Sequence, residues 1–240
     1  MLYLHWRKIS LISSLVALLA FSPTLHAQHS SDNINYFAFS KRPYYFGLRI
    51  ASIYSDFQIN PSKNFIGGDY TTIKSITGSG AGASVVFNLK VGKFFDLRLL
   101  PTVSYQSRDF IFTSPSQGET TDRIESIFLE MPILVRYKSK AYKDKKAFLV
   151  GGVKYAYDVQ SNSKLDQKRF NDILRTSPHD FSLEIGAGIQ FFFPYFIFSP
   201  EIKFSQGIDN MLIYNKNLPR AKVIESILSR SISISVHFEG

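Results

Sequence analysis

Charged side chains that lie inside strand-like segments are the residues of this chain with the greatest capacity for chemistry. Wherever apolar residues occupy every second position, the positions between them hold Ser, Gly, Thr, Ala and single charges of both signs. A set of this kind could carry ions or protons, or its members could pair with one another in a narrow interior. The set consists of Arg49, Lys90, Arg98, Glu130, Arg136, Lys154, Asp158, Glu184, Glu201 and Lys203.

Groups suited to catalysis are sparse. The histidines beyond residue 27 are His29, His179 and His237, and only His179 has a neighbouring acid, Asp180. The chain shows neither a nucleophile elbow nor an H-E-x-x-H metal spacing. It contains no cysteine, which excludes thiolate nucleophiles, thiolate zinc sites and disulfides. We therefore predict a protein that is not an enzyme and has no metal site and no cofactor.

A glycine run at residues 78–82, Gly-Ser-Gly-Ala-Gly, superficially resembles a phosphate-binding loop. A dinucleotide fingerprint requires a strand before the glycines and a helix after them. Here the following residues, Ser84–Val91, alternate like a strand. The run is therefore interpreted as glycine that eases strand curvature.

The elements that must position the charges are strands. Residues 231–238 read Ser-Ile-Ser-Ile-Ser-Val-His-Phe, an alternation with the period of a strand that has one apolar and one polar face. Seven earlier segments show similar patterns. The predicted strands cover residues 44–54, 80–91, 96–112, 124–138, 147–159, 180–192, 196–206 and 231–238.

The connections between these strands alternate in length. Long polar loops are predicted at 57–78, 113–123, 160–178 and 207–223, and short turns join the other strands. Long outer loops and short periplasmic turns are typical of bacterial outer-membrane barrels, and an even strand count places both termini in the periplasm. The sequence thus predicts an all-β, eight-stranded, antiparallel, up-and-down transmembrane β-barrel. Eight strands leave room for side chains rather than a channel, so a structural network of paired charges is favoured over an ion path.

Two soluble alternatives fit less well. A lipocalin-like barrel would carry its apolar face inside and dense charge outside, whereas the polar face here has only one or two charges per strand. An aromatic β-sandwich core is the other alternative. Aromatic residues make up 15% of the chain, which suits the rings found at the two interfaces of a membrane barrel.

Three segments are predicted along the chain. Residues 1–27 resemble a signal peptide, with Arg7 and Lys8 before an apolar run and a Leu25-His26-Ala27 cleavage site. Residues 28–43 form a short polar periplasmic lead-in, and residues 44–240 form the barrel. The net charge of +9 is spread along the chain, which suits anionic lipid heads better than nucleic acid. We predict an exported protein of the bacterial outer membrane that contacts lipid, with no nucleic-acid partner and no small-molecule substrate identified.

Several stretches resemble a known group of barrels. Ile127–Lys138, IFLEMPILVRYK, resembles the "LEIPLLLKYK" strand of outer-membrane barrels common in Bacteroidetes. Gly151–Asp158, GGVKYAYD, resembles the next strand of the PorT/SprT branch. The hairpin at 184–203, continuing to Gly207, and the segment Lys41–Leu48 resemble other strands of that branch. One departure is the ending, because barrels often finish on an aromatic residue and here Glu239 and Gly240 come last.

The resemblance implies an outer-membrane accessory or assembly component of the type IX protein secretion system, in some members tied to gliding motility, with other secretion components as partners. Such a protein would act through contacts at its loops and rims. Two alternatives stay open: a small barrel for adhesion or envelope integrity, and a barrel-embedded enzyme that modifies lipid.

Overall fold

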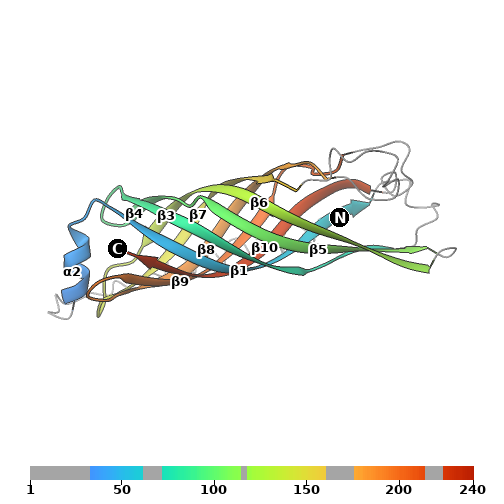
Figure 1. Ribbon diagram of the computed structural model, residues 1–240. Helices are drawn as coiled ribbons and strands as arrows, with labels where there is room; N and C mark the ends of the chain where they lie inside the picture. The colour runs from blue at the N-terminus through green and yellow to red at the C-terminus, as the bar shows by residue number, and fades with distance from the viewer. Residues whose placement is uncertain (1–32, 62–71, 115–117, 161–175, 214–223) are drawn as a thin grey trace, which may run out of the picture. The chain divides into compact units, whose positions relative to one another are not determined.

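The computed structural model describes residues 33–61, 72–114, 118–160, 176–213 and 224–240. The predicted signal peptide lies outside these ranges. Within them the chain is almost entirely antiparallel strand (Figure 1). One helix, α2, covers Ile34–Ser40, and the strands are β1 (Tyr44–Pro61), β2 (Thr72–Ile76), β3 (Gly78–Lys90), β4 (Phe95–Leu99), β5 (Thr102–Ser114), β6 (Gly118–Lys138), β7 (Lys145–Asp158), β8 (His179–Phe192), β9 (Ile197–Gly207) and β10 (Ile224–Glu239).

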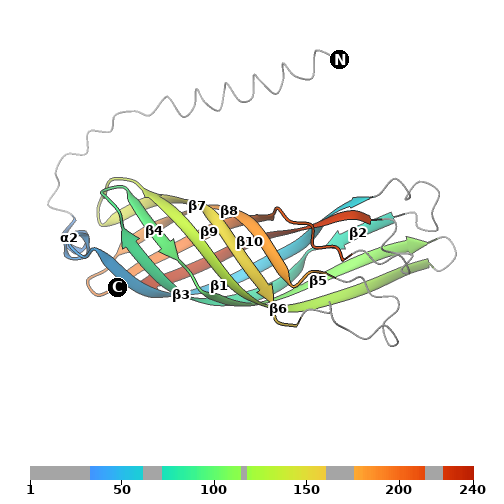
Figure 2. The ribbon, with the colours of Figure 1, turned by 90° about the horizontal axis from the view of Figure 1, so that it is seen from above.

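The strands close into a ring, as the prediction required. Each strand from β6 to β10 pairs with the next in antiparallel fashion, and β10 then pairs with β1. β1 also pairs with β3, which completes the circle through β4 and β5 to β6. Two positions in the ring are each shared by consecutive strands, β2 with β3 and β4 with β5, so the ring has eight positions. The eight-stranded antiparallel barrel is confirmed (Figure 2).

The interruption between β4 and β5 falls at Leu100 and Pro101, inside the strand predicted at 96–112. Proline has no N–H to give to a ladder and is found at strand ends and bulges. Here the Pro101 carbonyl still accepts a hydrogen bond from the Val85 amide at 3.1 Å, and the Leu100 amide donates to Pro132 at 3.2 Å. The ring therefore stays closed across the break.

Several strands extend further than the alternation indicated. β1 continues to Pro61 and β6 begins at Gly118, so parts of the loops predicted at 57–78 and 113–123 are strand. β10 begins at Ile224, seven residues before the predicted start at 231. The stretch 118–123 reads GETTDR and is polar on both faces, so periodicity could not reveal it. Most of the loops predicted at 160–178 and 207–223 lies outside the described residues.

The two faces of the barrel wall have opposite chemistry. The side chains of Ile133 and Ile185 point outward with 48% and 66% of their surface exposed, whereas Leu134, next to Ile133, is fully buried inside. Outward aromatic residues lie near both ends of the strands, as barrels carry them at membrane interfaces. They include Tyr44, Phe95, Tyr137 and Phe238 at one end and Tyr155, Tyr157 and Phe181 at the other. No helix in the described part of the chain is long and apolar enough to cross a membrane.

The glycine run of residues 78–82 lies in β3, so it is not a phosphate loop. A Cβ added at Gly80 would lie 2.2 Å from the carbonyl oxygen of Tyr105 on the neighbouring strand β5. Any side chain at this position would force the two strands apart. Glycine is required here for close approach of two backbones.

The described part of the predicted polar lead-in contains the short helix α2. α2 lies at the same end of the barrel as the C-terminus and the short turns (Figure 1). The turn at Lys143 and Asp144 has positive φ at both residues, 48° and 55°, as a two-residue type I′ hairpin requires. This turn places the Asp144 carboxylate beside α2, and its Oδ1 accepts a hydrogen bond from the Tyr36 amide at 2.9 Å. The Asp144 amide in turn donates to the Asn33 side chain at 2.9 Å.

Candidate functional site

The polar face of the barrel wall points into its interior and is buried there. Nine of the ten charged residues singled out from the sequence have 8% or less of their surface exposed, and the tenth, Lys90, is half-buried. They do not form one network. The structure separates them into two clusters of ion pairs and several residues that stand apart.

The first cluster, called the central cluster here, contains Arg98, Arg136, Glu201, His237 and Glu239. Arg98 donates a hydrogen bond to Glu239 and lies 3.7 Å from a carboxylate oxygen of Glu201. His237 lies 3.6 Å from Glu239 and 3.7 Å from Glu201. Because each of these side chains is fully buried, the pairs are shielded from solvent screening.

Arg136 joins the central cluster to a carboxylate nearer the short turns. Its guanidinium lies 3.6 Å from Glu239 and donates to Asp96 at 2.6 Å. It also donates to the Tyr45 hydroxyl. Lys138 contacts the other oxygen of Asp96. One buried carboxylate therefore balances two cations at this level of the barrel.

The second cluster contains Glu130, Lys154, Glu184 and Lys203. Lys203 donates to Glu184 at 2.7 Å, and Lys154 lies 3.7 Å from Glu184 and 3.8 Å from Glu130. Glu130 also accepts a hydrogen bond from Ser104 at 2.6 Å. Two acids and two bases are thus arranged in alternation across β6, β7, β8 and β9.

The remaining predicted residues stand apart from both clusters. Arg49 donates to Ser84 at 3.3 Å and to Ser233 at 3.2 Å, which are neutral acceptors. Asp158 accepts a hydrogen bond from the Gln160 amide at 3.0 Å, close to the end of its strand. Lys90 lies at the turn end of the barrel, where its ammonium group donates to the main-chain carbonyl of Phe39.

Little empty space remains between these side chains. A cavity beside Glu130, Lys154 and Asp180 measures about 10 Å³. This is about the smallest space that can hold one water molecule. At this level the cavity between the charged side chains therefore has room for about one water molecule.

Neither histidine of the described chain forms an accessible catalytic set. His179 and Asp180 are adjacent in sequence but point to opposite faces of β8, with Asp180 buried inside and His179 exposed beside Tyr155. His237 has Ser235 at 3.2 Å and Glu201 at 3.7 Å, which is a serine, histidine and acid combination. All three are at most 3% exposed, so no substrate can reach them. Among the described residues, no group of three or more His, Asp or Glu side chains is arranged so that it could hold a metal ion.

Several interior charges were not singled out from the sequence: Asp96, Arg108, Lys138, Lys146, Asp180 and Glu239. Glu239 is the most consequential omission, because it was interpreted only as a departure from an aromatic ending. It is two residues beyond His237, so extending the period-two alternation by one step would have placed it inside. Lys138 follows Arg136 by one step of the same alternation, whereas Asp96 is the first residue of a predicted strand and Lys146 lies just before one.

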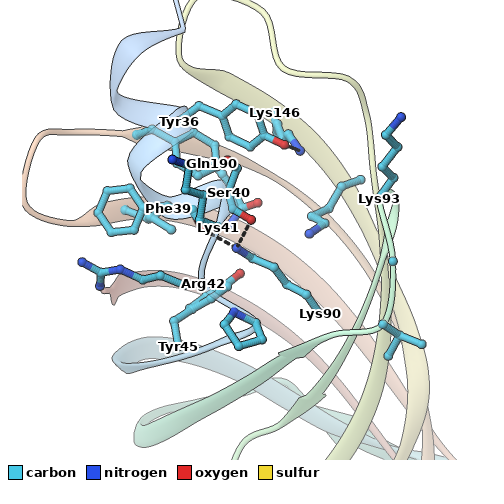
Figure 3. A pocket seen from close by; sticks show the side chains of 16 residues that line it. Tyr36, Phe39, Ser40, Lys41, Arg42, Tyr45, Lys90, Lys93, Lys146 and Gln190 are labelled. Atoms are coloured by element: carbon cyan, nitrogen blue, oxygen red, sulfur yellow. Dashed lines mark hydrogen bonds between the residues drawn. The ribbon is translucent and has the colours of Figure 1, made fainter.

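Around the turn end of the barrel, α2 and the strand ends enclose a cavity of about 430 Å³, called the basic pocket here (Figure 3). Phe39 of the helix packs against Tyr45, Phe192 and Ile197 to form its apolar wall. Figure 3 shows Lys90 reaching toward the main chain at Ser40. The hydrogen bonds of Lys90 to the main chain of α2 and the packing of Phe39 against the strands together hold the helix over the basic pocket.

On the other side of the basic pocket, Lys146 donates to the Tyr36 hydroxyl at 3.0 Å. Its ammonium group also lies 4.1 Å from the centre of the Tyr36 ring. Burial raises the pKa of Tyr36, and the nearby Asp96 carboxylate raises it further. The phenol is therefore a neutral hydroxyl at ordinary pH and adds no negative charge to the pocket.

Comparisons with known proteins agree with this architecture. A family model described as "Outer membrane protein beta-barrel domain" matches residues 27–212. A comparison with curated protein sequences finds no match.

Among solved structures, the outer membrane protein OprG from Pseudomonas aeruginosa is 10% identical, with 82% of this chain and 95% of that chain covered and a TM-score of 0.49. Neisserial surface protein A is 11% identical, with coverages of 80% and 95% and a TM-score of 0.39. Ail, the attachment invasion locus protein of Yersinia pestis, is 9% identical, with coverages of 83% and 100% and a TM-score of 0.36. The match of the family model over more than half of the sequence shows that the chain belongs to the outer membrane protein beta-barrel domain family and is a β-barrel of the outer membrane.

Proposed function

We propose that this protein is a closed, non-conducting barrel that serves adhesion or envelope integrity through its outer surface and its two rims. The observation that carries this proposal is the filled interior, where buried ion pairs such as Arg98–Glu239 and Lys203–Glu184 cross between strands. A barrel with such an interior cannot act by passing solutes through itself. Under this proposal the protein acts through what its surfaces contact, without catalysis and without a cofactor.

Two surfaces support this proposal. The outward apolar face, which includes Ile133 and Ile185, suits outer-membrane lipid. Toward the other end, the outer parts of β1, β5 and β6 continue the wall beside the short strand β2, with the partly exposed ion pairs Arg230–Asp56 and Arg123–Asp109. By the length rule for barrel connections, this end faces outside and the short turns face the periplasm. The extended wall would then be the part presented to the surroundings.

A second candidate function is an accessory or assembly role in type IX protein secretion, a role that some members of the resembling group combine with gliding motility. It is supported by the resemblance to the PorT/SprT branch. The resembling stretches 127–138, 151–158 and 184–203 fall on the consecutive neighbours β6, β7, β8 and β9. In this role the partners would be other secretion components bound at the rims.

Conductance of the purified full chain in planar bilayers tests the closed barrel. We expect no stable channels in the nanosiemens range, because the interior charges are paired and the space between them is too small for a column of water. The variant Glu130→Ala should lower stability without opening a pore. Stable channels whose ion selectivity changes in Glu130→Ala, with unchanged stability, would overturn the proposal.

A deletion strain separates the two candidate functions. Under the envelope proposal, the strain becomes sensitive to detergents or loses adherence while secretion continues. Periplasmic accumulation of secreted cargo, together with co-purified secretion components, would favour the secretion role instead.

A further inference from the structure

The basic pocket has an imbalance of charge that the two ion-pair clusters of the barrel interior do not have. Its lining includes six cationic side chains and no carboxylate. The cations come from the segment after α2, from the turn between β3 and β4, and from the facing ends of β6 and β7. They are Lys41, Arg42, Lys90, Lys93, Lys138 and Lys146.

The nearest buried acid does not correct this imbalance. Asp96 lies below the pocket, and its two oxygens are already engaged by Arg136 and Lys138. Lys90 and Lys146 contact only neutral oxygens, from the main chain of α2 and from the Tyr36 hydroxyl. No ion pair within the described ranges involves either of these two lysines. Like charges held together in a partly buried space repel one another, and a bound anion would relieve that repulsion.

We infer that the basic pocket is a binding site for a phosphate-bearing anion. Several ammonium groups without carboxylates suit phosphate, which lysine binds as a point charge and which carries one or more negative charges. The volume of about 430 Å³ has room for a phosphate with an attached glycerol or a second phosphate. The apolar wall of Phe39, Phe192 and Ile197 gives the uncharged part of such a ligand a surface to contact.

The phosphate could come from either of two sources. Short turns of outer-membrane barrels face the periplasm, so the pocket would lie at the level of the phospholipid head groups of the inner leaflet. A soluble phosphate ester or pyrophosphate in the periplasm presents the same chemistry. This site goes beyond the proposed function, because it would exist whether the barrel serves adhesion, envelope integrity or secretion.

Isothermal titration calorimetry tests the site. Pyrophosphate is titrated into the purified full chain in a zwitterionic detergent, and the heat of binding gives the Kd. The test variant is the double substitution Lys90→Gln and Lys146→Gln, which removes the two lysines that lack acidic partners. The control is Lys140→Gln with Lys143→Gln, which removes the same charge from exposed positions of the neighbouring turn, outside the pocket lining. We expect the Kd of pyrophosphate to rise about tenfold or more in the test variant and to stay within about twofold in the control.

The source of the phosphate can be determined with the same wild-type and variant proteins in nanodiscs. Native mass spectrometry would compare retention of phosphatidylglycerol with that of a neutral diacylglycerol. Lipid retention that pyrophosphate displaces assigns the site to head groups. Pyrophosphate binding without lipid retention assigns it to a soluble ester.

Two results would overturn the inference. One is equal weakening in the test and control variants, which would reveal attraction to the general charge of this rim. The other is the absence of binding to both probes in a wild-type protein whose unfolding transition shows it to be folded.

Discussion

Buried cationic side chains in the middle of the barrel have different partners from those in the basic pocket. In the middle, Arg98, Lys154 and Lys203 each lie within 4 Å of a buried carboxylate. At the turn end, Lys90 and Lys146 have neutral oxygens as partners in the described part of the chain. The first arrangement fills and seals the barrel, whereas the second leaves positive charge facing an open cavity. The difference indicates that charge in one barrel can serve structure at one level and binding at another.

The largest effect is expected from Arg98→Ala in the central cluster. Arg98 is fully buried and lies against both Glu201 and Glu239, so its removal leaves Glu201 without a guanidinium partner and leaves Glu239 with Arg136 alone, at 3.6 Å. Breaking a buried pair by removing one partner costs about 3–5 kcal/mol. The free energy of unfolding in urea, measured in lipid vesicles, should fall by this amount.

The exposed pair Arg230–Asp56 provides the control for this prediction. Arg230 is 45% exposed in its side chain, and its pair lies beyond the filled interior. Arg230→Ala should lower the free energy of unfolding by only about 0–1 kcal/mol. Equal losses in the two variants would mean that burial does not distinguish these ion pairs.

A smaller effect is expected from Asp96→Asn, at the boundary between the two regions. Arg136 retains the Tyr45 hydroxyl and lies 3.6 Å from Glu239, and Lys138 faces the basic pocket. Because both cations keep other polar surroundings, we expect a loss of about 1–3 kcal/mol in the free energy of unfolding.

Asp96→Asn should also change the affinity of the basic pocket for pyrophosphate. Losing the Asp96 carboxylate makes the basic pocket more positive, so pyrophosphate should bind more tightly to Asp96→Asn than to the wild type. Weaker binding would show that Asp96 instead holds Lys138 in the position that the ligand requires.

The barrel itself could be predicted from the sequence because its two faces meet different surroundings. Alternation through residues such as Ile133 and Leu134 separates a lipid face from a packed interior, and one step along the strand reverses the face. That signal disappears where both faces of a strand are polar. Residues 57–61 of β1, 113–114 of β5 and 118–123 of β6 therefore fall in predicted loops, and residues 224–230 of β10 fall in no predicted strand.

The pairing of the interior charges could not be predicted in the same way. Alternation shows that Arg98 and Glu201 point inward, but their contact depends on the register of strands far apart in the sequence. The basic pocket depends on even more distant parts, since Tyr36 in α2 meets Lys146 across 110 positions. The helix was missed because seven residues give too short a pattern, and its place is fixed by Asp144 in a turn that belongs to another hairpin.

The smallest effect on stability is expected from the double substitution Lys90→Gln and Lys146→Gln. The change removes the contact of Lys146 with the Tyr36 ring, but it also relieves repulsion among the ammonium groups of the pocket. These two contributions oppose each other, so the free energy of unfolding should change by less than about 1 kcal/mol. Adding pyrophosphate should then stabilise the wild type, because a ligand that binds only the folded state raises its stability, and should leave the variant nearly unchanged. A loss as large as that of Arg98→Ala would show that these lysines, like the central cluster, hold the barrel together, and the distinction between the two regions would fail.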